Sequence, residues 1–501
     1  MSIRTRFRKS IQLLIAIIAA IVIAIVVNDR KHVSRQIAVE PADAIAIDPT
    51  HALERFQRAI QIETVSAANP ARVQKTTFLE FASFLKDAFP TIHAEPISRM
   101  AGDDWDDPSN LTLLYQWPGS DPKLDPILLM AHFDVVPVDA ETREKWTHAP
   151  FSGEIDQDFV WGRGTLDAKN SALAMMEAIA HLLQENFDPR RTVYLSFGHD
   201  EEVGGQRGNA RVADWMTSQG VRLQFVLDEG GCIFRDFPGM DRHVALIGIA
   251  EKGFANIRLT ATLQDGGGHA SMPPTQTAIE VLAAAIDRLN HTPLPRRIGQ
   301  AGQLMLDYLG PEMKWPNRTV IANRWLFTPL IRRQLGATES GNAMLRTTIA
   351  PTLIRGGVKE NVLPSQATAT LNCRLLPGDR LSMVVDHIRH AIDDSRITIE
   401  VDDSAREASR ISDTNCTEFS VLHRSLQAIY PDVVVAPFVL VGGTDSYHFQ
   451  DIAKNIYRII PARLDANDLK RIHGVDERIA TSDYLDLIRF YVRLIRKSAA
   501  G

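Results

Sequence analysis

The stretch Pro126–Asp134, PILLMAHFD, decides the fold. Its apolar run from Ile127 to Ala131 ends abruptly, and His132 and Asp134 follow with one residue between them. Such a run predicts a buried strand that feeds a loop. In open α/β sheets, ligands bind at the carboxyl ends of such strands. Alternate residues of an extended chain point to the same side, so a metal-binding histidine oriented by a carboxylate fits this spacing, although a solvated turn also fits it.

The composition is that of a globular protein with ample core. The chain has 501 residues, enough for two or more domains, and its formal net charge of −6 offers no basic surface for nucleic acid. Its three cysteines, Cys232, Cys373 and Cys416, lie far apart, which argues against a disulfide framework and against a thiolate zinc site. Any metal ion is therefore held by His, Asp and Glu, which suits a catalytic site.

The N-terminal residues predict a membrane anchor. Basic residues precede the run Ile11–Val27, which is apolar except for Gln12 and would form a helix of about 25 Å, just enough to span a bilayer. They favour a cytoplasmic N-terminus, so the rest of the chain would be periplasmic, lumenal or extracellular. A cleaved signal peptide is the alternative, because Ala44-Ile45-Ala46 fits the A-x-A pattern. We expect an uncleaved single-pass anchor at residues 1–28 and a linker at 29–49.

Two further apolar runs end in the same way as the first. Thr192–Phe197 leads into Gly-His-Asp-Glu-Glu, and Leu223–Leu227 leads into Asp-Glu-Gly-Gly. A glycine-containing loop places Asp167 just before a long predicted helix, 170–184. Strands that alternate with helices predict a mainly parallel sheet, so the larger domain belongs to the α/β class.

The pattern changes near Lys252. Polar and apolar residues alternate over 257–263 and again over 367–373, and helical spacing follows each segment. This predicts a smaller α+β domain inserted between two parts of the larger one. The predicted division is 50–251 for the first part of the catalytic domain, 252–398 for the inserted lid or dimerisation domain, and 399–501 for the second part of the catalytic domain.

Candidate metal ligands lie at the ends of the apolar runs and in the loops. The five candidates are His132, Asp167, Glu202, Asp228 and His473. One catalytic zinc ion needs three protein ligands, so five ligands fit two metal ions that share a bridging carboxylate. Such a pair lowers the pKa of a bridging water toward about 7 and polarises a carbonyl group. Glu201 and Glu202 point to opposite sides of an extended backbone, so one can bind metal while the other takes a proton; alone, the pair also suits a solvated turn.

Eight motifs in a fixed order resemble one known family. They are AHFDVVP, WGRGTLDAKNS, HDEEVGG, LDEGG, GGGHASMPP, NVLPSQATATLNCRLLPGD, GGTDS and HGVDERI. Together they resemble the aminoacylase/carboxypeptidase S family of di-zinc metallopeptidases, from about His51 to Arg496. Segments 342–348 and 357–362 resemble the carboxypeptidase S-like branch in particular, which includes secreted N-acyl-amino-acid hydrolases.

The resemblance implies a set of metal ligands. It assigns His132 and Asp228 to one ion, Glu202 and His473 to the second, and Asp167, with a cis Asp167–Ala168 peptide, to the bridge. His448 is an alternative ligand, but the family's C-terminal histidine precedes a Gly or Ser and an Asp/Asn-Glu pair, which is the pattern at His473. The expected cofactor is two Zn²⁺ ions, with Co²⁺ or Mn²⁺ as substitutes.

The resemblance also implies the catalytic and substrate-binding residues. Glu201 would be the general base and then the acid, and Asp134 would orient the metal-binding histidine. His269 of the inserted domain would stabilise the oxyanion, and in dimeric relatives it comes from the partner subunit. Asn361 and Arg374 would bind the substrate, with the Arg374 guanidinium at its carboxylate.

The expected function is a zinc-dependent metallopeptidase that hydrolyses the bond next to a C-terminal amino acid, as a carboxypeptidase S-like enzyme or a dipeptidase. A metal-activated water would attack, with Glu201 as the base. An N-acyl-amino-acid amidohydrolase of the aminoacylase type would use the same site, and a non-catalytic metal-binding protein is the remaining alternative. The expected partners are short peptides or N-acyl amino acids, the membrane, and a second copy of the chain bound through the inserted domain.

Overall fold

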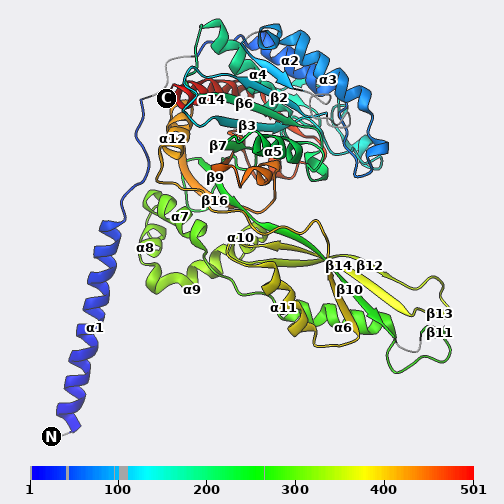
Figure 1. Ribbon diagram of the computed structural model, residues 1–501. Coiled ribbons are helices and arrows are strands. Elements are labelled where there is room, and N and C mark those ends of the chain that lie inside the picture. The colour runs from blue at the N-terminus through cyan, green and yellow to red at the C-terminus, as the bar shows by residue number, and fades with distance from the viewer. Residues whose placement is uncertain (1–2, 41–44, 95, 101–110, 264–265, 501) are drawn as a thin grey trace.

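The computed structural model describes residues 3–40, 45–94, 96–100, 111–263 and 266–500. Figure 1 shows three parts: a large α/β domain, an elongated unit beneath it, and a separate helix, α1 (Ile3–Lys31), that extends away from both. The metal-ligand candidates of the sequence all belong to the α/β domain.

Strand β3 (Ile127–His132) lies at the centre of the large sheet. It pairs in parallel with β6 (Val193–Gly198) on one side and with β7 (Leu223–Asp228) on the other. All six residues of β3 are buried. Leu129 faces one hydrophobic cluster and Leu128 faces another, because successive side chains point to opposite faces of a sheet. The predicted buried strand is confirmed, and its carboxyl end lies beside those of two parallel neighbours.

The large sheet is mixed and has ten strands within the described residues. Their spatial order is β1 (Ser98–Met100), β2 (Leu113–Trp117), β6, β3, β7, β17 (Ala453–Arg458), β9 (Val244–Glu251), β8 (Ile233–Phe234) and β18 (Arg463–Leu464), with β16 (Val434–Leu440) paired to β9. The central pairs from β6 to β17 are parallel, whereas β1–β2, β2–β6 and β17–β9 are antiparallel. The prediction of parallel strands therefore holds at the centre, where the site lies, and antiparallel strands extend the sheet on both sides.

Helices bury both faces of this sheet. The cluster that contains Leu129 includes side chains from α2 (Pro49–Gln61), α3 (Lys75–Ala88), α4 (Lys169–Gln184), α12 (Thr417–Ile429) and α14 (Thr481–Ala499). The cluster that contains Leu128 includes α5 (Asn209–Ser218). A small antiparallel sheet of β4 (Ile155–Asp156), β5 (Phe159–Trp161) and β19 (Arg478–Ala480) joins segments far apart in the sequence. The β5–β19 pairing brings the loop with Asp167 close to the loop with His473.

The inserted unit has its own core. Four antiparallel strands lie in the order β12 (Thr348–Gly356), β14 (Gln366–Leu375), β10 (Gly253–Thr262) and β15 (Ile397–Val401), beside α6 (Ala278–His291) and α11 (Leu381–Ile392). Burial alternates along β10 and β14, as the sequence predicts for strands with one exposed face. The short pair β11 (Gly268–His269) and β13 (Val362–Leu363) lies at the end of this unit furthest from the large sheet (Figure 1).

Residues 300–345 depart from the predicted division of the chain. They form α7 (Gln300–Leu309), α8 (Asn317–Ala322), α9 (Arg324–Leu335) and α10 (Glu339–Leu345). Met305 and Leu306 of α7 belong to the hydrophobic cluster of the large domain, together with strand β16. The α+β unit predicted for 252–398 is thus interrupted, because an apolar stripe with helical spacing does not reveal which sheet it covers.

Helix α1 packs against the rest of the chain through its last turns. Lys9–Lys31 is long and apolar enough to cross a membrane, with a mean hydropathy of 3.0, and it is the one such helix among the described residues. Asn28 Nδ2 donates to Asn323 Oδ1 at 3.1 Å, and Thr319 Oγ1 donates to Asp29 Oδ1 at 3.1 Å. The direction of α1 is therefore fixed relative to α8 and to the start of α9.

Candidate metal centre

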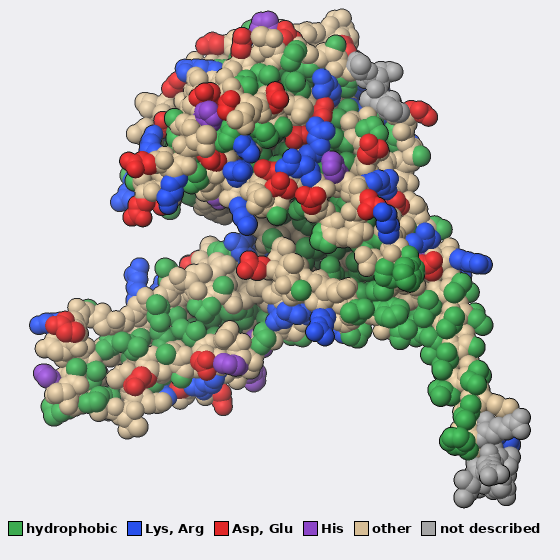
Figure 2. All heavy atoms as spheres, turned by 180° about the vertical axis from the view of Figure 1, so that it is seen from behind, with side chains coloured by type: hydrophobic (Ala, Val, Ile, Leu, Met, Phe, Trp, Pro, Cys, Tyr) green, Lys and Arg blue, Asp and Glu red, His purple; other side chains and the backbone are tan. Residues whose placement is uncertain are grey.

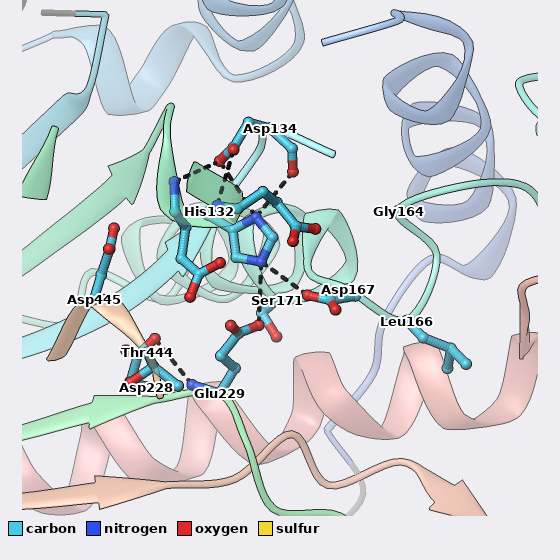
Figure 3. Close-up of polar contacts among 12 residues, drawn as sticks. His132, Asp134, Gly164, Leu166, Asp167, Ser171, Asp228, Glu229, Thr444 and Asp445 are labelled. Carbon is cyan, nitrogen blue, oxygen red and sulfur yellow. Dashed lines mark hydrogen bonds and ion pairs between the residues drawn. The ribbon is translucent and has the colours of Figure 1, made fainter. Parts of the chain in front are cut away.

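Neighbouring strand ends deliver the first side chains of the site. His132 is the last residue of β3, the 3-10 helix η5 (Glu201–Val203) begins three residues after β6 ends, and Glu229 directly follows β7. The three strands are parallel and adjacent, so these side chains meet at one edge of the sheet. Figure 3 shows Asp134, Asp167 and Glu229 arranged around the His132 ring.

Asp167 lies between two histidines. Its Oδ1 is 2.8 Å from His132 Nε2, and its Oδ2 is 3.0 Å from His473 Nε2. Glu202 completes the group, with a carboxylate oxygen 3.1 Å from His473 Nε2. One carboxylate that directs each of its oxygens to a different imidazole has the arrangement of a bridging ligand. The structure thus brings together four of the five predicted ligands, and the Asp167–Ala168 peptide is cis.

The fifth predicted ligand, Asp228, does not point toward this group. Its Oδ1 accepts a hydrogen bond from the Glu229 amide at 2.9 Å, and its Oδ2 accepts one from the Ser446 amide at 3.0 Å. The neighbouring Glu229 takes the position instead, with Oε2 at 3.3 Å from His132 Nε2 (Figure 3). Adjacent residues at a strand end point in opposite directions, so the geometry favours Glu229 over Asp228 as the candidate ligand at this position.

Asp134 orients two elements of the site. Its main-chain carbonyl accepts the hydrogen bond from His132 Nδ1 at 2.9 Å, while its carboxylate lies at 3.5 Å from the same nitrogen. With Nδ1 protonated, Nε2 keeps its lone pair for a metal ion. The Asp134 carboxylate accepts hydrogen bonds from the amides of Glu201 at 3.1 Å and Glu202 at 3.2 Å. The predicted orienting residue therefore acts largely through its backbone and also positions the glutamate pair.

The charges of the site are unbalanced. Burial raises the pKa of Glu201 well above its usual range, and repulsion from Glu229 acts in the same direction. Burial also raises the pKa of Glu229 to about 8, because attraction to His132 only partly offsets it. The pKa of Asp167 is low despite its burial, since His132 and His473 hydrogen-bond to it. In turn, the hydrogen bonds from Asp167 and Glu202 raise the pKa of His473 to about 10. Buried carboxylates that repel one another are stabilised by positive charge between them.

The donor set fits divalent metal ions. His132, Asp167 and Glu202 each offer one ligand atom with all three atoms within 4.8 Å of one another, and His132, Glu201 and Glu229 do the same. Imidazole nitrogens and carboxylate oxygens, with no thiolate, are the ligands of catalytic zinc and related ions. The two groups share His132, and Asp167 connects the first of them to His473.

Glu477 supports the loop that carries Asp167, and it was not among the predicted site residues. It is fully buried; its Oε1 accepts hydrogen bonds from the amides of Gly164 at 3.0 Å and Leu166 at 2.9 Å, and its Oε2 pairs with Arg163 at 2.6 Å. Four residues before it in the chain lies His473. The segment 473–477 therefore supplies a candidate ligand and also holds the loop opposite to it. In the sequence, only the motif HGVDERI, which contains Glu477, drew attention to this segment.

Comparison with known proteins identifies the family. Residues 128–497 match the family described as peptidase family M20/M25/M40. The chain belongs to this family. It is 36% identical over 493 residues to the probable carboxypeptidase S-like 2 of Dictyostelium discoideum. The alignment covers 96% of this chain and 93% of that protein. It is also 38% identical over 451 residues to the N-fatty-acyl-amino acid synthase/hydrolase PM20D1 of Homo sapiens. That alignment covers 89% of this chain and 87% of that protein.

Solved structures show the same M20 fold. The metallo-carboxypeptidase Sso-CP2 of Sulfolobus solfataricus superimposes with a TM-score of 0.63 at 18% identity, over 89% of this chain and 98% of that chain. The family match and the curated relatives confirm the resemblance to the aminoacylase/carboxypeptidase S family. The chain is a hydrolase of the M20 metallopeptidase family, whose relatives include carboxypeptidases and a hydrolase of N-acyl amino acids.

Three residues expected to bind substrate or stabilise the oxyanion lie outside the cluster. The alternative ligand His448 is not in either group of candidate ligands, and burial lowers its pKa. His269 is exposed at the tip of the inserted unit, where its Nδ1 lies 2.7 Å from Ser271 Oγ. Asn361 is close to it, since its carbonyl accepts the Ala270 amide at 3.1 Å.

Arg374 lies at the opposite end of the inserted sheet from His269. It is near the end of β14, and its guanidinium lies over the Phe254 ring at 4.9 Å from the centroid. Phe254 follows the first residue of β10, directly after the crossing from the large domain. The predicted residues of the inserted domain therefore lie in two separate regions of one chain, with His269 and Asn361 in one and Arg374 in the other. Neither region is part of the metal-ligand cluster.

Proposed function

We propose that this M20 hydrolase uses two metal ions, with zinc preferred, to cleave an amide bond next to the free carboxylate of a C-terminal amino acid. The observation that carries the proposal is Asp167 between two imidazole nitrogens, at 2.8 and 3.0 Å. One ion would be held by His132 and Glu229, the second by Glu202 and His473, and both by Asp167. When bound, the ions supply Lewis acidity for a substrate carbonyl and make a water acidic enough to react near pH 7.

Glu201 is the proton-transfer residue of the proposed mechanism. A ligand atom of Glu201 lies within 4.8 Å of both His132 and Glu229, and its amide is held by the Asp134 carboxylate at 3.1 Å. Its carboxylate accepts the proton of the attacking water and later donates it to the leaving nitrogen. Burial raises its pKa, which makes it a stronger base than an exposed glutamate. His132 stays oriented throughout because its Nδ1 remains bonded to the Asp134 carbonyl.

The proposed substrate groups bind on the inserted unit, which acts as a lid. Arg374 would bind the carboxylate of the substrate, since a guanidinium pairs with a carboxylate through two hydrogen bonds. Asn361 would contribute a polar contact, and His269 would donate to the oxyanion. Within one chain, His269 is far from the large domain (Figure 1), which supports a role in the site of a second subunit.

A homodimer through the inserted unit is supported by its exposed edge. Strand β12 lies at one end of the four-stranded sheet, and two of its side chains, Leu353 and Ile354, are 57% and 65% exposed. Val358, just beyond the strand, is 94% exposed. An open edge strand with apolar side chains invites pairing with another strand. A second copy of the chain has the same edge and fits it through two-fold symmetry.

Mixing two inactive variants tests the exchange of His269. Glu201→Gln and His269→Ala are each expected to be inactive alone. In a mixed dimer, one site combines an intact Glu201 with an intact His269 from the other subunit, so an equal mixture should recover about one quarter of the wild-type kcat. The subunits are refolded or co-expressed together, and light scattering measures the mass. No recovery in a demonstrated dimer would place His269 in the site of its own chain.

An N-fatty-acyl amino acid is the second candidate substrate. A hydrolase and synthase of this class is among the relatives that the chain resembles over 89% of its length. We also propose that α1 is an uncleaved membrane anchor with the catalytic domain outside the cytoplasm, which would bring the site near lipidic substrates. The apolar segment Lys9–Lys31 and the contacts that dock its end to α8 support this assignment.

Side-by-side hydrolysis assays decide between the substrates. The full-length chain in detergent, supplied with Zn²⁺, is incubated with short peptides and with N-acyl amino acids of increasing acyl length. We expect release of a C-terminal amino acid, and complete loss of turnover after chelation with recovery on adding Zn²⁺ back. Release from peptides supports the carboxypeptidase, and release only from N-acyl amino acids supports the second candidate. No turnover of either class, with two metal ions bound, would refute the proposed function.

A further inference from the structure

Helix α9 and the residue Trp315, which precedes α8, present large exposed apolar side chains. Trp315 is 81% exposed, Trp325 is 58% exposed, and Leu326 and Leu330 are 40% and 42% exposed. These residues fall within one stretch of sixteen, here called the 315–330 surface. Large apolar side chains that gather on a surface mark a site of contact with a protein or a membrane.

Helix α9 has two apolar faces instead of one. Phe327, Ile331 and Leu335 pack toward the hydrophobic core of the large domain. At 100° per residue, Leu326 lies about 140° around the helix from the centre of this core-facing stripe, and Trp325 and Leu330 flank Leu326 at about 120° and 100° from that centre. A surface helix of a protein surrounded by water has a single apolar stripe, so the outer stripe of α9 requires a second apolar partner.

The contacts of α1 set the height of this surface. Asn323, fully buried and directly before α9, donates from Nδ2 to the main-chain carbonyl of Ile25 at 3.1 Å. Ile25 precedes the last residue of α1, Lys31, by six residues, which is about 9 Å along the helix axis. The headgroup layer of each leaflet is about 5–8 Å thick. The start of α9 is therefore level with the apolar part of α1.

Figures 1 and 2 show the same relation. In Figure 1, α9 lies at the lower side of the body, beside the C-terminal half of α1, while the large domain is on the opposite side. Figure 2, from behind, shows hydrophobic side chains that cover α1 and continue onto the adjoining part of the body. Two pairs besides Asn323 fix this arrangement: Arg318 donates to the Asp29 carbonyl at 3.3 Å, and Thr319 donates to the Asp29 side chain at 3.1 Å.

We propose that the 315–330 surface inserts into the interfacial layer of the phospholipid bilayer that α1 spans. Trp325, Leu326 and Leu330 face the acyl chains beside the apolar part of α1, and Trp315 lies at headgroup level, where tryptophan is favoured. The proposal rests on the proposed anchor role of α1 and goes beyond it. With α1 and α9 both in the membrane, the body is held at two points and cannot swing freely about its linker, so the metal site of the large domain keeps a fixed distance from the bilayer.

Fluorescence quenching by brominated lipids tests this contact. The full-length chain and its Trp325→Phe variant are reconstituted into phosphatidylcholine vesicles with and without bromine on the acyl chains. The difference between the two proteins gives the emission of Trp325, which we expect bromine to reduce by at least about twofold. Trp215→Phe is the matched control, because Trp215 lies on α5 of the large domain, and its difference emission should not change.

Each outcome of the test is informative. Co-flotation of the chain with the vesicles shows whether α1 anchors the chain in the membrane. Quenching shows whether the 315–330 surface contacts lipid. A chain that floats while Trp325 keeps its emission overturns the surface contact alone. A chain that does not float refutes the anchor and the surface together. The variant Leu326→Glu with Leu330→Glu should abolish the quenching while turnover of a soluble N-acetyl amino acid stays unchanged, and persistent quenching would contradict the proposal.

Discussion

Glu201→Gln is expected to lower kcat by about 10²–10⁴-fold while both metal ions stay bound. The amide side chain has the same shape but cannot accept the proton of the attacking water. The backbone amide of residue 201 still donates to Asp134, so the Glu202 carboxylate keeps its position beside His473. The measurement combines steady-state kinetics with the metal content after dialysis against metal-free buffer.

A matched control separates this effect from the loss of a negative charge. Glu54→Gln removes a carboxylate from an exposed position on α2 and should leave kcat, KM and metal content unchanged. Near-wild-type turnover of Glu201→Gln would show that another group transfers the proton. Loss of a metal ion from Glu201→Gln would instead make Glu201 a ligand, which its place within 4.8 Å of His132 and Glu229 would then explain.

Glu229→Gln is expected to lose one of the two metal ions and to reduce kcat/KM by about 100-fold or more. Glu229 Oε2 lies at 3.3 Å from His132 Nε2, and an amide there offers a weaker, uncharged ligand. Asp228→Asn should behave differently, because both oxygens of Asp228 accept backbone hydrogen bonds. Its amide group would oppose one of those donors, so we expect a loss of stability of about 1–3 kcal/mol with both ions retained.

Metal analysis and thermal unfolding distinguish these two neighbours. The expected pattern is one ion per chain and near-normal apo stability for Glu229→Gln, against two ions per chain and a lower Tm for Asp228→Asn. The reverse pattern would restore the assignment of Asp228 as the ligand. Equal loss of one ion from both variants would mean that the site tolerates no change at this strand end, and it would contradict the separate roles described here.

Local sequence was sufficient for the part of the site that depends on strand ends. The run before His132 is apolar on both faces, so it had to be a buried strand, and the carboxyl end of a buried parallel strand is where a polar side chain becomes accessible. The same reasoning selected Glu202 after β6. Asp167 and His473 were selected through motifs, and the β5–β19 pairing joins their loops.

Sequence determined which residues are available, and tertiary structure decided which of them face the site. The adjacent Asp228 and Glu229 have the same charge, and a strand that ends one residue earlier or later exchanges their directions, so only the register of β7 distinguishes them. Glu477 holds a loop more than 300 positions away, a contact that no local pattern encodes. Likewise, the sequence did not show that α7 packs on the large sheet, because hydrophobic burial has no direction and accepts any apolar partner that the fold brings near.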